Sequence, residues 1–267
     1  MSVYYYPTEN ETSTTLTIIL SSGLGGRAHF WQPQIAALTP YFNVLTYDHE
    51  GTSINDDALP EGYTIQDMAK QLKDIVTLYK IKQCHFIGHA LGAFIGIELA
   101  YLMPNLIQKM IIINAWDQLD AHTIKCFQTR ETLLRDSGAS SYIAAQALFL
   151  YPPQWISDHI GELIQQEQEM VKHFPDTENV IRRLSALQSY QPIQHIDCLN
   201  MPCLVIVNKD DFLVPWQRSK AFYEHLQDAT LIMINEGGHA STMTQTDQIN
   251  RYLIQFLTSV KEAELNI

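Results

Sequence analysis

Residues 84–104 read CHFIGHALGAFIGIELAYLMP. A short apolar run up to Ile87 meets Gly88, and the apolar spacing then changes to that of a helix that ends before Pro104. The stretch therefore predicts a buried strand, a tight turn and a buried helix. Gly88 and Gly92 allow the strand and the helix to approach closely, and this packing role alone would explain the pair.

The turn carries a second pattern. Residues 88–92 read GHALG, which is the G-x-S-x-G sequence of the nucleophile elbow in α/β-hydrolases with Ala90 in the place of the serine. The middle residue of such an elbow has a strained backbone, and its neighbours lie close to the helix and the strand, so glycine is favoured on both sides. The pattern predicts an elbow that has no nucleophile.

The composition is typical of a packed globular enzyme. The chain has 267 residues, of which 46% are hydrophobic, and this is enough for one α/β domain with an insertion. Its formal net charge of −12 would repel nucleic acid and anionic membranes, so we expect neither as a partner. The same charge does not attract an anionic substrate, which would need local cations.

The N-terminal residues, MSVYYYPTENE, have no basic segment followed by an apolar stretch, so we expect a cytoplasmic protein. Residues 86–103 are almost long enough to cross a bilayer, but His89, Glu98 and three glycines favour a buried core helix. The cysteines form no C-x-x-C pair and have no histidine at metal-ligand spacing. We therefore expect reduced thiols, no metal and no cofactor.

A glycine-rich loop, SGLGG at residues 22–26, follows a strand predicted at residues 15–21. Beside an elbow, such a loop lends a backbone N–H to an oxyanion hole. The expected donors are the N–H groups of Leu24 and, directly after the elbow, Leu91.

The same loop also fits a dinucleotide fingerprint, with Asp48 about 20 residues further on as a ribose ligand. Pro33 disfavours this alternative, because it predicts a helix that begins near Trp31 or Gln32. A bound pyrophosphate would need the helix to begin among the glycines. Asp48 is then an acid at a strand end that anchors the following turn.

Strands and helices alternate along most of the chain. Thr64 and Asp67 predict a capping box at the start of an amphipathic helix. A wholly apolar strand is predicted at residues 110–113, a buried strand at 202–207, a further strand at 230–234 and a final helix at about 244–260. Strands that are apolar on both sides are typical of a mostly parallel sheet with helices on both faces.

The alternation stops between residues 115 and 196, where the apolar spacing is helical almost throughout. Because the alternation resumes afterwards, we expect a helical lid at 115–196 rather than a separate domain, on a core of residues 1–114 and 197–267. Two apolar helix faces are predicted inside the lid: Ile156, Ile160, Leu163, Met170, Val171 and Phe174, and then Val180, Ile181, Leu184 and Leu187.

An acid and a histidine follow the last two strands. The loop NKDDFLVP, residues 208–215, offers Asp210 or Asp211, and GGHA, residues 237–240, offers His239. Elbow, acid and histidine in this order match the α/β-hydrolase arrangement. The predicted pair is Asp211 with His239, and Asp210 is the alternative acid.

The whole chain resembles the α/β-hydrolase superfamily and, within it, the RutD family of the bacterial Rut pathway for uracil degradation. The segments that carry the closer resemblance are SGLGG (22–26), GHALGA (88–93), LFLYP (148–152) and GGHA (237–240). The distance from Asp211 to Pro215 also matches the family pattern. An alanine in the elbow is what this resemblance implies, together with hydrolysis of a small C–N compound, either carbamate or aminoacrylate.

Without a serine, His239 oriented by Asp211 can act as a general base only on water. For a small anionic substrate, Arg130 and Arg182 are the predicted binding residues, with Arg183 as a further candidate. His89 is expected to pack into the scaffold rather than to face the pocket.

Two other functions stay open, of which the first needs no serine and the second does. One is a non-catalytic protein that binds a ligand or the other enzymes of the pathway. The other is a conventional esterase or lactonase, which would need a covalent acyl-enzyme. The expected partner is a small-molecule substrate, and a homodimer is possible.

Overall fold

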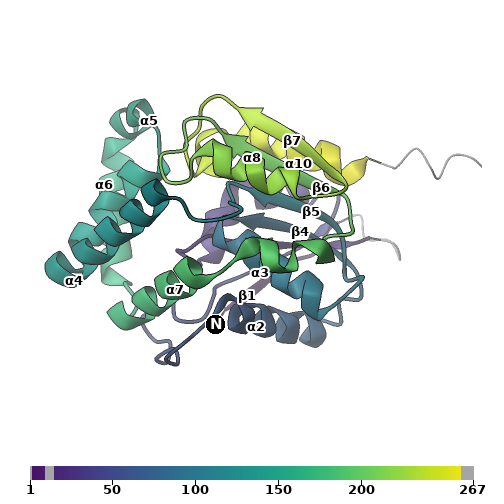
Figure 1. The fold of residues 1–267 in the computed structure, drawn as a ribbon, viewed down its shortest axis with the longest axis horizontal. Helices are drawn as coiled ribbons and strands as arrows, with labels where there is room; N and C mark the ends of the chain where they lie inside the picture. The colour runs from purple at the N-terminus through teal and green to yellow at the C-terminus, as the bar shows by residue number, and fades with distance from the viewer. Residues whose placement is uncertain (1, 10–14, 260–267) are drawn as a thin grey trace, which may run out of the picture.

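The structure is a computed structural model that describes residues 2–9 and 15–259. Seven strands of the described residues form one sheet in the order β1-β3-β2-β4-β5-β6-β7 (Figure 1). All neighbours are parallel except the edge strand β1, which runs antiparallel to β3. The strands are β1 (Val3–Tyr6), β2 (Thr17–Ser21), β3 (Asn43–Tyr47), β4 (Cys84–His89), β5 (Ile107–Ile113), β6 (Cys203–Asn208) and β7 (Ala229–Ile234).

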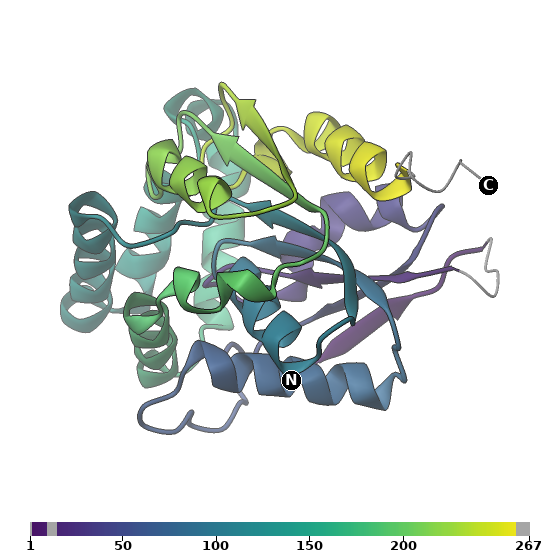
Figure 2. The ribbon, with the colours of Figure 1, turned by 45° about the vertical axis from the view of Figure 1, so that its right-hand side comes forward.

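Helices cover both faces of this sheet, as the apolar strands predict (Figure 2). One face packs against α1 (Gln32–Leu38) and α10 (Thr246–Thr258). The other packs against α2 (Ile65–Leu78), α3 (Leu91–Leu102) and α8 (Trp216–Glu224). Successive strand residues alternate between the two cores, since side chains in a strand point to opposite faces. Ile18 and Leu20, for example, face α1 and α10, whereas Ile19 faces α2 and α3.

The predicted helix starts are found where local chemistry sets them. Thr64 and Asp67 form the capping box of α2, since each side chain accepts from the other's backbone N–H. A short 3-10 turn, η1 (Ala28–Trp31), precedes α1, which begins at Gln32 with Pro33 in its first turn. The final helix is split into α9 (Ser241–Thr244) and α10, and residue 260 of its predicted range lies outside the described residues.

Helices alone connect β5 to β6. They are α4 (Ala121–Leu150), which is interrupted at Gly138, α5 (Pro153–Asp158), α6 (Ile160–Lys172), α7 (Thr177–Ser189) and the 3-10 segment η2 (Pro192–Cys198). Figure 1 shows α4, α5 and α6 gathered at one end of the sheet. No helix among the described residues is long and apolar enough to span a membrane.

The two apolar faces predicted in these helices differ in burial. Ile181, Leu184 and Leu187 of α7 are buried, in agreement with the pattern. In α6 only Leu163 is buried, and Ile160 and Met170 are about half exposed. Amphipathic spacing shows which residues share a face, but only tertiary packing decides whether that face is covered.

The topology places four connecting loops at one edge of the sheet. Because β2, β4, β6 and β7 are parallel, the loops that follow them all leave from the carboxyl edge. These loops contain residues 22–26, Ala90, Asp211 and His239, respectively. The fold thus brings together segments from both ends of the sequence, from residue 22 to residue 239.

Candidate active site

The turn between β4 and α3 has the backbone of an elbow. Ala90 has φ 47° and ψ −113°, a conformation that is rare for a residue with a side chain. Its neighbours have to be glycine: a Cβ on Gly88 would lie 2.5 Å from the backbone of Ala93, and one on Gly92 would lie 2.0 Å from the carbonyl oxygen of Ser21. Close backbone contact therefore explains both glycines, and the strained residue between them is an alanine.

His239 and Asp211 are in direct contact. The Nδ1 of His239 lies 2.7 Å from Oδ2 of Asp211, and both side chains are buried. The other carboxylate oxygen of Asp211 accepts hydrogen bonds from the N–H groups of Leu213 and Val214, both 2.9 Å long. Because an ionised carboxylate can only accept, Nδ1 of His239 carries the proton and Nε2 keeps a free lone pair. That lone pair can take a proton from a bound molecule.

The alternative acid has another partner. The carboxylate of Asp210 accepts from the N–H groups of Gly237 and Gly238, both 2.9 Å long. Both glycines have positive φ, at 140° and 65°, so Asp210 stabilises the tight loop that leads to His239. Asp211 thus orients the side chain of His239, and Asp210 stabilises the loop that carries it.

Two side chains support His239 from behind. The backbone carbonyl of His239 accepts from Nε2 of His89 and from Nδ2 of Asn114, each at 2.8 Å. The rings of His89 and His239 lie edge to face with centroids 4.7 Å apart. Burial, and then the neighbouring His239, lower the pKa of His89 to about 3, so His89 is neutral. His89 packs into the scaffold, and Asn114 is a supporting residue that the sequence pattern did not reveal.

The glycine-rich loop forms a turn beside the elbow. The N–H of Gly26 donates to the carbonyl of Gly23 at 2.9 Å, which directs that carbonyl into the turn. In a trans peptide the N–H of Leu24 points in the opposite direction, away from the turn. The N–H of Leu91 belongs to the first turn of α3, where an amide has no acceptor within its own helix. Leu24 and Leu91 as oxyanion donors stay a prediction, one that this backbone geometry permits.

Asp48 has a role in holding this loop. Its Oδ1 accepts the N–H of Ala28 at 2.8 Å, within the turn η1. The α-helix begins only at Gln32, beyond the glycines. A dinucleotide site would need a helix that begins at the glycines and an acid free to bind a ribose. Here α1 begins at Gln32, and Asp48 binds the backbone of Ala28.

The three arginines considered for anion binding lie in different surroundings. Arg130 is buried on α4, where its guanidinium donates to the hydroxyl of Tyr142 at 3.0 Å and stacks over the rings of Tyr142 and Phe149. The Nε of Arg130 is buried without a hydrogen-bond partner among the described residues. Arg182 is bound to the carbonyl of Leu59.

Arg183, next to Arg182 on α7, reaches the glycine-rich turn. Its guanidinium donates to the carbonyl of Leu24 at 3.0 Å. The structure brings Arg183 to the glycine-rich loop and Arg182 to Leu59, and substrate binding by Arg130 and Arg182 stays a prediction. A helix turns by about 100° per residue, so neighbouring arginines must point in different directions.

Residues of the connecting helices rest on the histidine and acid loops. The carbonyl of Leu150 accepts the N–H of Ala240 at 3.0 Å. The hydroxyl of Thr123 donates to the carbonyl of Leu213 at 3.1 Å, and the ring of Phe149 packs near Phe212. These contacts hold α4 over the loops of Asp211 and His239.

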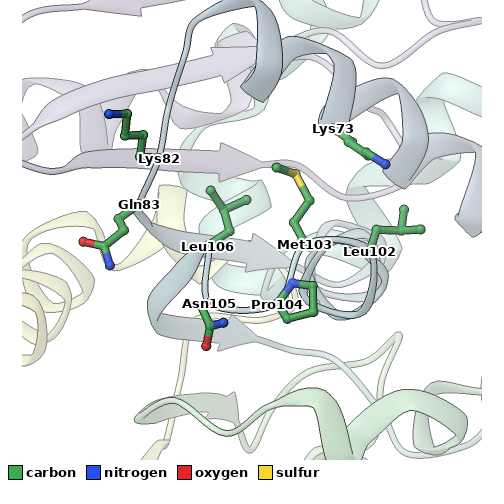
Figure 3. Close-up of a pocket in the computed structure, with 8 residues that line it drawn as sticks. All are labelled: Lys73, Lys82, Gln83, Leu102, Met103, Pro104, Asn105 and Leu106. Carbon is green, nitrogen blue, oxygen red and sulfur yellow. The ribbon is translucent and has the colours of Figure 1, made fainter.

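A cavity of about 620 Å³ lies elsewhere on the molecule (Figure 3). It is open to solvent and is lined by residues at the end of α3, by the segment before β4 and by one lysine of α2. Its lining residues are Lys73, Lys82, Gln83, Leu102, Met103, Pro104, Asn105 and Leu106. Because these residues lie where β4 and β5 begin, the cavity is at the opposite edge of the sheet from His239.

No group of three or more potential metal-ligating side chains occurs within residues 2–9 and 15–259. The four cysteines are free thiols, and Cys84, Cys126 and Cys203 are buried. Burial raises the pKa of the Cys84 and Cys203 thiols to about 12, so neither is a thiolate near neutral pH.

Comparison with known proteins identifies the family. A family model described as alpha/beta hydrolase fold matches residues 17–246. The chain belongs to the α/β-hydrolase fold family. The expected α/β-hydrolase fold, with its mostly parallel sheet and helices on both faces, is confirmed.

Similarity to individual proteins places this α/β-hydrolase more closely. It is 46% identical over 245 residues to a protein from Acinetobacter baylyi, covering 90% of this chain and 92% of the relative. It is 38% identical over 265 residues to one from Serratia proteamaculans, covering 99% of both chains. Both relatives carry the name "Putative carbamate hydrolase RutD". The α/β-hydrolase therefore belongs to the RutD family, as its sequence segments indicate.

Solved structures agree with the fold. An enol-lactonase from Burkholderia xenovorans superposes with a TM-score of 0.84 at 21% identity, covering 96% of both chains. The hydrolase MGS-M2 from a deep-sea metagenome superposes with a TM-score of 0.87 at 20% identity, covering 97% of this chain and 95% of the other. At such low identity these similarities establish the fold alone.

Proposed function

We propose that this RutD-family α/β-hydrolase accelerates hydrolysis of carbamate or aminoacrylate with a water molecule that His239 activates. The observation that carries the proposal is the 2.7 Å contact between His239 and Asp211 beside an elbow whose central residue is Ala90. This contact supports Asp211 and His239 as the acid and base of the site, and with Ala90 at the elbow the nucleophile has to come from outside the chain. The name printed for the relatives, "Putative carbamate hydrolase RutD", supports carbamate as the substrate.

In the proposed reaction, water binds above Ala90, where a serine hydroxyl would otherwise lie. Nε2 of His239 takes a proton from this water while its oxygen adds to the carboxyl carbon of carbamate. The N–H groups of Leu24 and Leu91 stabilise the negative charge that develops on oxygen. His239 then returns the proton to the nitrogen, the C–N bond breaks, and ammonia and bicarbonate leave.

Aminoacrylate can follow the same route. A proton from solvent adds to the carbon next to its carboxylate, which turns the enamine into an iminium ion, and the activated water then adds to the carbon that carries the nitrogen. His239 takes a proton from the water and returns it to the nitrogen, and loss of ammonia and of the proton gained from solvent gives 3-oxopropanoate. Both substrates are small carboxylates whose C–N bond is lost to water.

The rate that this site can supply is modest. A positioned acid–base group contributes on the order of 10² to 10⁴-fold, and an oxyanion hole contributes more. Carbamate and aminoacrylate both break down without an enzyme, so an acceleration of this size is sufficient. It would not be sufficient for a stable amide.

Further elements of the proposal come from the sequence. Residues 115–196 act as a lid on the core, and Arg130 lies in this lid as one of the groups that attract the substrate. A cytoplasmic location and a homodimer also stay predictions. Nucleic acid is not an expected partner, because the net charge is −12.

The test is a direct assay of carbamate and aminoacrylate disappearance, corrected for the spontaneous rate. The wild-type protein should exceed that rate, and His239→Ala should lose most of the excess. His173→Ala is the matched control, because His173 is exposed at the C-terminal end of α6, where its Nε2 pairs with Glu169. Equal rates for wild type, His239→Ala and buffer would contradict the proposal.

Ala90 also favours a second candidate, a ligand-binding or partner protein without chemistry. In that case the protein would bind other enzymes of the pathway or a small ligand, and His239→Ala would leave binding unchanged. Turnover above the spontaneous rate excludes this alternative. A conventional esterase is disfavoured by the same residue, since an acyl-enzyme needs a nucleophile at the elbow.

A further inference from the structure

The guanidinium of Arg183 is buried without an acid beside it. Arg183 is 1% exposed, and no carboxylate among the described residues lies within ion-pair distance of it. Its hydrogen bonds go to neutral groups: the carbonyl of Glu50 at 3.2 Å, the carbonyl of Leu24 at 3.0 Å and Nδ1 of His49 at 3.0 Å. Lysine and arginine side chains are rarely buried in this way unless they are paired.

This cation remains charged. Burial lowers the pKa of Arg183 to about 10, which is still well above neutral pH. Burial also lowers the pKa of His49 well below its usual value, so His49 is neutral and adds no charge of its own. The chain has 29 acidic residues against 17 lysines and arginines, so the missing partner does not reflect a shortage of carboxylates. Asp56 acts on this charge from beyond ion-pair distance, so the guanidinium is a buried positive charge without a carboxylate in contact.

The position of the charge is set by the glycine-rich turn. Arg183 is bound to the carbonyl of Leu24, whose N–H is the proposed oxyanion donor. A Cβ on Gly26 would lie 2.6 Å from a terminal nitrogen of Arg183, and Gly26 has φ 67°. The turn therefore lies in direct contact with the guanidinium, which is bound to the same residue, Leu24, whose N–H is the proposed oxyanion donor.

This arrangement matters for the substrates of the proposed function, on which the following step rests. Carbamate and aminoacrylate are anions, and the protein as a whole carries −12. Addition of hydroxide to carbamate places a second negative charge on the same small molecule. A buried cation acts strongly here, because the low local dielectric weakens its field less than water would.

We propose that Arg183 makes the site select small carboxylate anions over neutral molecules of the same shape, by holding a positive charge behind the turn of residues 23–26. Arg183 does not need to touch the substrate for this. It fixes the turn through Leu24, and its charge acts through the turn. It is a specificity-determining residue rather than a catalytic one.

The competing explanation is that Arg183 has a purely structural role and only links α7 to the core. In that case, replacing Arg183 would lower the stability of the protein but leave the preference of the site for anions over neutral molecules unchanged. The two roles are separated by comparing an anion with its neutral isostere, because both probes fit the same space. Trifluoroacetate and trifluoroacetamide form such a pair, and fluorine NMR measures the binding of each.

Wild-type protein should bind trifluoroacetate at least about tenfold more tightly than trifluoroacetamide. Arg183→Met should abolish this preference, and Arg183→Lys should keep part of it, because lysine retains the charge without the three hydrogen bonds. Arg135→Met, on the surface of α4, is the control and should bind like wild type. An unchanged preference in Arg183→Met, or none in the wild type, would overturn the proposal.

The result is independent of whether the site turns over substrate. The preference should persist in His239→Ala, so binding selectivity without turnover would reject the proposed hydrolysis but keep the role of Arg183. Turnover without a preference for the anion would support the proposed hydrolysis and reject the role of Arg183. If Arg183→Met fails to fold, the wild type still decides: a buried charge is poorly screened, so the preference should survive about 0.5 M sodium chloride. Its loss in salt would show that surface charges cause it.

Discussion

The elbow and the histidine loop lie side by side at the carboxyl edge of the sheet. The elbow has the backbone geometry of a hydrolase site, and the histidine loop has its side chains. The elbow keeps its backbone: Ala90 retains the strained φ of 47°, and Gly88 and Gly92 retain the contacts that only glycine permits. The histidine loop keeps its side-chain chemistry, with His239 bonded to Asp211. A turn that had lost its purpose with its serine would not need such strain. The difference indicates that the elbow serves through its backbone and the histidine loop through its side chains.

The largest effect should come from the backbone of the elbow. Gly92→Ala places a Cβ 2.0 Å from the carbonyl oxygen of Ser21, which is part of β2 and cannot move aside. We expect a loss of more than about 4 kcal/mol in the free energy of unfolding, or no folded protein. Gly25→Ala is the control, since a Cβ there meets nothing within 4 Å, and its effect should stay within about 0.5 kcal/mol. Chemical denaturation measures both, and a mild effect at Gly92 would mean that the close approach is wrong.

The side chains of the histidine loop should matter for rate more than for fold. Asp211→Asn keeps the shape of the acid but can no longer fix Nδ1–H of His239, so the base loses its tautomer. We expect turnover above the spontaneous rate to fall roughly hundredfold or more. Asp210→Asn should affect the loop of Gly237 and Gly238, and thus stability, more than rate. If the two variants lose activity equally, then the division of work between the aspartates is wrong.

The two histidines at the junction of these regions should differ in their response to acid. The pKa of His89 is lowered to about 3, so the folded state does not take up a proton that the unfolded chain binds below about pH 6.5. The contribution of His89 to stability is therefore fully present above pH 6.5 and is lost as the pH falls toward 3. The free energy of unfolding should decrease by about 1.4 kcal/mol per pH unit in this window.

His89→Gln provides the check, because glutamine can still donate to the carbonyl of His239 but does not titrate. We expect the free energy of unfolding of His89→Gln, measured by denaturation between about pH 6.5 and 4.5, to fall less steeply with decreasing pH than that of the wild type. His29→Gln, on the exposed turn η1, is the control and should leave the slope as it is. An identical slope in wild type and His89→Gln would show that another group controls acid stability.

The smallest effect on stability should come from restoring the missing side chain. Ala90→Ser adds one polar atom at a position that is already strained, so the cost should be below about 2 kcal/mol. A serine there would complete a triad with His239 and Asp211, and hydrolysis of an activated ester should appear with a burst from the acyl-enzyme. Mass spectrometry should detect an adduct with a serine-directed phosphonate in this variant and none at the elbow of the wild type. A folded Ala90→Ser variant without adduct or burst would show that His239 is not placed to act on the elbow.

The sequence by itself determined those parts of the protein that depend on short-range patterns. The apolar run, the glycines and the following helical spacing at residues 84–104 predicted β4, the elbow and α3, because strand and helix periodicity are local properties. Thr64 and Asp67 predicted the start of α2 for the same reason. The order of elbow, acid and histidine predicted which loops meet, since parallel strands end at one edge of a sheet.

Tertiary structure alone decided which of several similar residues occupies each place. Asp210 and Asp211 are adjacent and chemically identical; the family pattern favours Asp211, but only the path of the loop shows that Asp211 contacts His239 while Asp210 binds Gly237 and Gly238. Arg182 and Arg183 are adjacent on α7, and only the packing of that helix brings Arg183 to Leu24. Asn114 gave no signal because its partner, the carbonyl of His239, is 125 residues away. These choices depend on distances between segments that are far apart in the chain, and a local pattern has no information about such distances.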